Sequence, residues 1–103
     1  MINYNKLVRD KIPDIIRSSG RTCRTKVASG DELIAYIIAK IHEELAEFEE
    51  SQSIEELADL YEALEALLVA KGFTPAKLAF ARRKKGESNG FFDKKLVLID
   101  VSD

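Results

Sequence analysis

The sequence predicts an all-α fold. Apolar residues recur at helical spacing in two long stretches, over residues 33–48 and 57–68. A serine followed three positions later by a glutamate precedes each stretch, which is the capping-box signature of a helix start. At 103 residues the chain has the length of one ordinary domain, so we expect a single domain over residues 1–103.

The first helix is expected close to the start of the sequence. Pro13 suits the first turn of a helix, where no backbone donor is needed, and Gly20 suits the position just after a helix end. The pattern therefore predicts a short helix from Ile12 to about Gly20. Residues 21–28 lack a helical period and contain several β-branched residues, so we expect them to be extended.

The second helix is expected to be the longest. Ser29 and Glu32 open it, and its periodic pattern continues to about Glu50. Its early part is apolar around most of its circumference. One neighbouring helix could not cover such a surface, which favours burial from several sides or across a subunit interface.

Two more helices and a strand complete the prediction. Ser53 opens a third helix that continues to Gly72, and Pro75 starts a fourth that we expect to end near Gly86. Residues 94–101 are rich in leucine, valine and isoleucine and predict a strand that can pair with residues 21–28. The predicted architecture is an antiparallel four-helix bundle, with a small two-stranded β ribbon beside it.

Composition and charge exclude several classes of protein. Hydrophobic residues make up 46% and charged residues 33% of the chain, as in a soluble globular protein, and the longest apolar runs are too short to span a membrane. A formal charge of −2 offers no overall attraction for a nucleic acid polymer. The start of the sequence lacks the pattern of a secretory signal and there is one cysteine, so we expect a cytoplasmic protein.

Two pairs of acidic residues lie at helical spacing. Glu44 and Glu47 are three positions apart on the second predicted helix, so both carboxylates project from one face. Glu56 and Asp59 repeat this arrangement on the third helix. The short link makes the two helices antiparallel neighbours, and both pairs are equally distant from its middle. We therefore expect four carboxylates to meet at matched heights, across an interhelical gap of about 8–10 Å.

Glu44 also stands in a packing stripe. It follows Ile37 and Ile41 at a position where a purely structural helix would carry leucine. Carboxylates gathered without compensation repel one another, so they must share protons or hold a cation. Oxygen ligands, with one histidine and one cysteine in the chain, favour Mg²⁺ or Mn²⁺ over zinc. The structural alternative is that glutamate is a good helix former and that Glu56 serves as a capping residue.

These motifs resemble those of a known family. The pattern Glu-Glu-x-x-Glu from Glu43, followed on the next helix by Glu-x-x-Asp from Glu56, resembles the signature of the all-α nucleotide pyrophosphohydrolases. This group contains the MazG-like and the phosphoribosyl-ATP pyrophosphohydrolase-like proteins. The segment from Tyr4 to Pro13, Tyr-Asn-Lys-Leu-Val-Arg-Asp-Lys-Ile-Pro, is similar to the start of the small phosphoribosyl-ATP pyrophosphohydrolase-like branch. The similarity spans nearly the whole chain.

The resemblance implies a reaction and a set of site residues. It implies a homodimer or homotetramer that hydrolyses a nucleoside triphosphate to the monophosphate and pyrophosphate with Mg²⁺, as house-cleaning enzymes do. The implied metal ligands are Glu44, Glu47, Glu56 and Asp59, and Glu43 is implied to orient or deprotonate the attacking water. A surface role for Glu43 stays open. Two other functions also stay open: phosphoribosyl-ATP pyrophosphohydrolase of histidine biosynthesis, and a helical interaction module without turnover.

Basic residues near both ends are candidates for binding the substrate phosphates: Lys6, Arg9, Lys11, Arg82 and Arg83. The alternatives are surface solvation and, near the end of the fourth predicted helix, a favourable interaction of positive charge with the helix dipole. One departure from the branch lies close by. The sequence has Ser88-Asn89-Gly90-Phe91 where that branch often has Arg-Gly-Gly-Phe, so this segment lacks the arginine of that motif.

Overall fold

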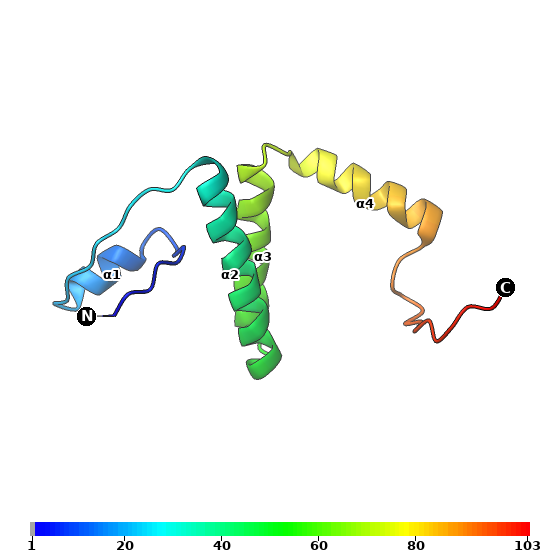
Figure 1. The fold of residues 1–103 in the computed structure, drawn as a ribbon, viewed down its shortest axis with the longest axis horizontal. Helices are drawn as coiled ribbons and strands as arrows, with labels where there is room; N and C mark the ends of the chain where they lie inside the picture. The colour runs from blue at the N-terminus through cyan, green and yellow to red at the C-terminus, as the bar shows by residue number, and fades with distance from the viewer. Residues whose placement is uncertain (1) are drawn as a thin grey trace. The chain divides into compact units, whose positions relative to one another are not determined.

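The structure of the protein is a computed structural model that describes residues 2–103. Four helices follow one another along the chain (Figure 1): α1 (Ile12–Ser18), α2 (Gly30–Ser51), α3 (Ile54–Ala70) and α4 (Pro75–Asn89). Within the described range no residue belongs to a β-strand, and no helix has both the length and the hydrophobicity to cross a membrane. The prediction of an all-α fold is therefore confirmed.

The helices belong to two compact units. One unit ends at Gly72 and contains α1, α2 and α3, whereas the other spans Phe73–Asp103 and contains α4. In the first unit, α2 and α3 pack against each other. Because the two units are defined separately, a bundle of all four helices and a single domain over residues 1–103 stay predictions.

A two-residue link joins α2 to α3, and the two helices lie side by side as a hairpin (Figure 1). Gln52 adopts the left-handed conformation with a φ of 57°, and its side-chain amide donates a hydrogen bond to the carbonyl oxygen of Glu49 at 2.9 Å. Ser53 caps α3, because its hydroxyl accepts a hydrogen bond from the backbone N–H of Glu56 at 3.3 Å. The predicted helix start at Ser53 is confirmed.

The hairpin buries few apolar side chains. Among the described residues, the buried apolar ones are Ile37 on α2 with Ala63 and Leu68 on α3. Other large apolar side chains of the same helices stay exposed: Ile38, Leu45, Ile54, Leu57, Tyr61, Leu64 and Val69. The hairpin therefore keeps apolar surface available for a further partner.

The predicted β ribbon is wrong. Residues 21–28 and 94–101 contain no strand, and they belong to different units. The apolar side chains of the second segment are exposed, and Leu96, for example, is 83% exposed. A β-leaning composition forms a strand only where a neighbouring strand completes the backbone hydrogen bonds and another layer covers the apolar face. These two segments meet neither condition.

The fourth helix continues past its predicted end at Gly86 and stops at Asn89. Gly90 follows with a φ of 83°, and its N–H donates a hydrogen bond to the carbonyl oxygen of Gly86 at 2.9 Å. The ring of Phe91 lies over Gly86, in the space that a Cβ atom would occupy. Gly86 therefore makes room for this ring inside the helix, and Gly90 is the glycine at which the helix ends.

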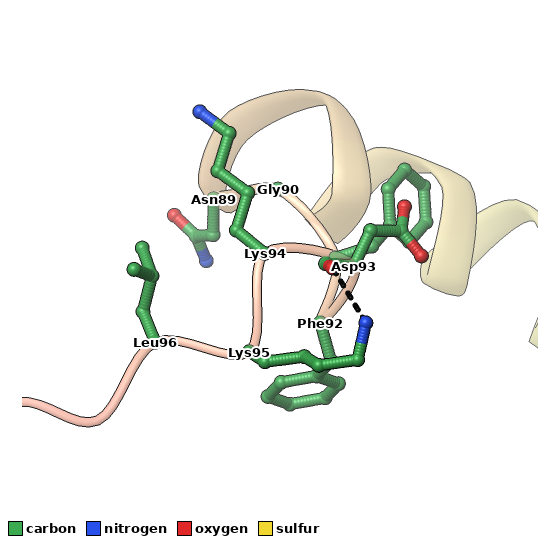
Figure 2. A pocket seen from close by; sticks show the side chains of 8 residues that line it. Asn89, Gly90, Phe92, Asp93, Lys94, Lys95 and Leu96 are labelled. Carbon is green, nitrogen blue, oxygen red and sulfur yellow. Dashed lines mark hydrogen bonds between the residues drawn. The ribbon is translucent and has the colours of Figure 1, made fainter.

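After α4 the chain curls around a shallow hollow of about 430 Å³ (Figure 2). The hollow is lined by the consecutive residues 89–96, and the ammonium of Lys95 donates a hydrogen bond to the carbonyl oxygen of Asp93 at 3.5 Å. It is the inside of one loop and gathers no side chains from separate helices. The α2–α3 hairpin, in contrast, brings acidic side chains of two helices together.

Candidate metal centre

Glu44 is a buried carboxylate on α2. It follows Ile37 and Ile41 at helical spacing, and only 4% of its surface is exposed. Burial raises its pKa above the ordinary value, and the nearby ammonium of Lys40 opposes this rise. The hairpin therefore holds a charged group at a position where helix packing would favour an apolar one.

Glu44 belongs to two groups of three carboxylates. In the first group, Glu43, Glu44 and Glu47 each place an oxygen within 4.8 Å of the other two. In the second group, Glu44 of α2 and two residues of α3, Glu56 and Asp59, also each place an oxygen within 4.8 Å of the other two. The five acidic residues of the sequence motifs thus fall into two groups, and Glu47 is grouped with Glu43 and Glu44 but not with Glu56 and Asp59. We call these five residues the acidic cluster. Glu44 is common to both groups.

The start of α3 supplies Glu56 and Asp59. The cap at Ser53 sets where the helix begins, and the spacing of three positions puts both carboxylates on one face. Oε2 of Glu56 is buried and, among residues 2–103, has no hydrogen-bond partner, and the same is true of Oε2 of Glu44. A buried acceptor without a donor costs about 1–3 kcal/mol, and more when it is charged. Two such oxygens on residues of the same group of carboxylates indicate a place for a positively charged ligand.

Lys40 belongs to the site although the acidic motifs do not include it. Its ammonium lies 3.2 Å from Oε1 of Glu44 and 3.5 Å from Oε1 of Glu43. Lys40 precedes these residues by four and three positions, which is the spacing at which ion pairs form along a helix. That spacing is the signal from which the sequence could have identified it. Lys40 compensates part of the negative charge on α2.

The N-terminal arm, residues 2–11, brings two more cations to the acidic cluster. Nζ of Lys6 donates a hydrogen bond to Oε1 of Glu43 at 2.9 Å, and Nη2 of Arg9 donates one to Oδ1 of Asp59 at 2.8 Å. The arm therefore contacts both helices of the hairpin. These hydrogen bonds raise the pKa of Lys6 and of Arg9, and the bond from Lys6 lowers the pKa of Glu43. Glu43 is thus held in its ionised form.

The other three predicted phosphate ligands belong to other elements of the chain. Lys11 is exposed at the N-cap position of α1. Arg82 and Arg83 are on α4 in the C-terminal unit, where Arg83 lies 3.8 Å from a carboxylate oxygen of Glu87. A phosphate-binding role for these three residues stays a prediction.

The acidic cluster fits a divalent cation. Within each group the carboxylate oxygens lie within 4.8 Å of one another, close to the separation of about 4.2 Å between opposite ligands of octahedral Mg²⁺. All the available ligand atoms are hard carboxylate oxygens, which Mg²⁺ and Mn²⁺ prefer. A cation bound by Glu44, Glu47, Glu56 and Asp59 would give both unpaired buried oxygens a partner.

Comparisons with known proteins give a short match. A stretch of 42 residues, 41% of this chain, is 52% identical to an uncharacterized protein of Mycolicibacterium smegmatis (strain ATCC 700084 / mc(2)155). The match covers 43% of that protein, so the chain spans less than half the length of the relative that it matches. No protein-family model matches the chain, and no solved structure matches it. The chain is therefore similar to a mycobacterial protein over part of its length, and its family stays a proposal.

Proposed function

We propose that this chain is a cytoplasmic, Mg²⁺-dependent nucleotide pyrophosphohydrolase of the house-cleaning type. It would hydrolyse a nucleoside triphosphate to the nucleoside monophosphate and pyrophosphate. The observation that carries the proposal is Glu44, 4% exposed, with one oxygen unpaired among the described residues and four further carboxylates around it. An apolar residue of similar size would avoid the cost of burying this charge, so packing alone does not explain it. The type of reaction is proposed from the resemblance of the acidic motifs to those of the nucleotide pyrophosphohydrolases.

The side chains at the site suit this hydrolysis. A divalent cation bound by Glu44, Glu47, Glu56 and Asp59 would neutralise charge on the phosphate oxygens and lower the pKa of water. Glu43 is ionised and partly exposed, so it can take a proton from a water molecule as the water oxygen attacks phosphorus. The bond between the α phosphorus and the oxygen that bridges it to the β phosphate then breaks, and pyrophosphate leaves with the electron pair of that bond.

A panel of nucleotides tests the proposed reaction. With Mg²⁺ present, we expect pyrophosphate to be released from several nucleoside triphosphates and expect no release after the divalent cations are removed with EDTA. Release from phosphoribosyl-ATP alone would instead assign the enzyme of histidine biosynthesis. Binding of Mn²⁺ without release from any nucleotide would assign a helical interaction module.

We also propose that the chain acts as a homodimer or homotetramer. The support is the apolar surface of the hairpin, because three buried apolar residues make a small core for helices of this length. Leu57, Tyr61 and Leu64 recur at helical spacing along α3, and all three are exposed. A second copy carries the same stripe, so pairing two hairpins would cover the apolar surface of both.

Leu64→Glu is expected to separate the subunits. Leu64 is 45% exposed, so the single chain tolerates a charge there, whereas an apolar interface would have to bury it. Gel filtration with light scattering should show the wild type as a dimer or tetramer and the variant at a smaller mass. Leu64→Met keeps the volume and should associate like the wild type. A wild type that is monomeric at tens of micromolar would contradict the proposed assembly.

A further inference from the structure

Among residues 2–103, three cationic side chains contact the acidic cluster: Lys6, Arg9 and Lys40. When all five carboxylates of the cluster are ionised, these three cations leave two negative charges uncompensated. One divalent cation carries the same amount of positive charge. The unpaired, buried Oε2 of Glu44 independently indicates where such a cation would be attracted. With all five carboxylates ionised, the charge of the site is therefore balanced only when a further cation is bound.

The two cations of the N-terminal arm differ from Lys40 in how firmly they are held. The side chains of Lys6 and Arg9 are 38% and 54% exposed, and each reaches the cluster from outside the hairpin. Lys40 is 19% exposed and lies on α2 beside its partners. Ion pairs between exposed groups contribute little to stability, because water screens them. The contacts of Lys6 and Arg9 can therefore be given up at little cost, whereas Lys40 stays in place.

A bound divalent cation would weaken both contacts of the arm. Asp59 cannot direct the same lone pair to a metal ion and to Arg9, and the positive charge of the metal ion repels both arm cations. A triphosphate then offers these cations new partners, because guanidinium and ammonium groups form strong, charge-assisted hydrogen bonds with phosphate oxygens. Release of Lys6 also removes the hydrogen bond that Oε1 of Glu43 accepts in the structure, whereas Lys40 stays 3.5 Å from that oxygen.

We infer that Lys6 and Arg9 exchange partners when the site is loaded. They leave Glu43 and Asp59 and bind phosphate oxygens of the nucleotide, so that the arm positions the triphosphate over the hairpin. This inference rests on the proposed function and deepens it, since it assigns the phosphate contacts to two of the five candidate cations. It also removes the hydrogen bond of Lys6 from Glu43 when the nucleotide binds.

Arg9→Ala tests the exchange with two probes that require no turnover. Binding of Mn²⁺ alone, followed by electron paramagnetic resonance, should be at least as tight in the variant as in the wild type, because a competing cation is removed. Binding of pyrophosphate at saturating Mn²⁺, followed by calorimetry, should weaken about tenfold or more, since a charge-assisted hydrogen bond is lost. Arg9→Lys keeps the charge without the planar fork and should recover part of the loss.

Lys26→Ala is the matched control. Lys26 is an exposed cation that forms a 3.2 Å ion pair with Glu32, outside the acidic cluster. This variant should bind Mn²⁺ and pyrophosphate like the wild type. Lys6→Ala/Arg9→Ala repeats the test without both arm cations, and circular dichroism confirms that each variant is folded.

The outcomes separate this inference from the proposed function. Pyrophosphate affinity that is unchanged in Arg9→Ala and in the double variant would overturn the exchange, even if the wild type hydrolyses nucleotides. Weaker binding of Mn²⁺ alone in Arg9→Ala would also overturn it, because the ion pair would then support the metal site. A wild type that binds both probes without hydrolysing any nucleotide would overturn the hydrolase and leave the exchange standing. A wild type that binds no Mn²⁺ would overturn both.

Discussion

Glu44→Gln is expected to abolish divalent-cation binding and pyrophosphate release while leaving the helices intact. Glutamine has nearly the same volume as glutamate, so α2 and α3 should pack as before, but the central negative charge of the cluster is gone. Removing an outer-shell partner of a metal site lowers metal affinity or activity about 10–100-fold. The loss of a direct ligand should lower them further. Mn²⁺ binding, a pyrophosphate-release assay and far-UV circular dichroism measure the three quantities.

The same variant should change stability in a defined direction. Burial raises the pKa of Glu44, so above the ordinary value of 4.5 the metal-free folded protein retains protons there that the unfolded chain has released. This contribution to stability falls as the pH rises from 4.5 through the raised pKa. Glu44→Gln should remove this pH dependence and be at least as stable as the metal-free wild type at neutral pH.

Glu50→Gln is the control for Glu44→Gln. Glu50 is exposed near the end of α2, and neither group of three carboxylates includes it. The substitution removes the same charge from the same helix, so the variant should bind Mn²⁺ and turn over like the wild type. Full activity in Glu44→Gln would contradict the role of Glu44 as a metal ligand.

Glu43→Gln is expected to lower kcat strongly while leaving Mn²⁺ affinity nearly unchanged. Glu43 accepts a hydrogen bond from Lys6 and is partly exposed, and we propose that it takes the proton of the attacking water. Loss of a general base reduces the rate about 10²–10⁴-fold. Steady-state kinetics give kcat, and electron paramagnetic resonance gives the Mn²⁺ affinity.

The contrast between the two variants tests the division of roles within the cluster. Glu43 and Glu44 are adjacent, yet Glu43 should accept the proton of water, whereas Glu44 should bind the metal ion. If Glu43→Gln kept the kcat of the wild type, Glu43 would be a surface residue that pairs with Lys6 and Lys40. If it lost Mn²⁺ binding as completely as Glu44→Gln, Glu43 would be a ligand as well.

The helices and the acidic cluster were predictable because their signals are local. Helical periodicity and the N-cap serines place α2 and α3 to within a few residues, and a two-residue link allows one way to bring them together. The buried position of Glu44 follows from its place in an apolar stripe. Acidic residues at a spacing of three on both helices then meet without information from the rest of the chain.

The features that the sequence did not predict depend on distant parts of the chain. A β ribbon was expected from the composition of residues 21–28 and 94–101, but composition does not provide the partner that a strand needs. The pairs of Lys6 with Glu43 and of Arg9 with Asp59 join residues 37 and 50 positions apart, so no local pattern predicts them. The end of α4 was misplaced because two glycines could serve as its stop, and only Gly90 adopts a positive φ.

Anomalous scattering from crystals soaked in Mn²⁺ tests the central claim most directly. We expect a peak between α2 and α3 at which carboxylate oxygens of Glu44, Glu56 and Asp59 converge. A carboxylate of Glu47 should complete the set of ligands. Crystals that show no peak at this position at saturating Mn²⁺, with the five carboxylates paired only with lysine and arginine, would contradict the claim that the hairpin is a metal centre.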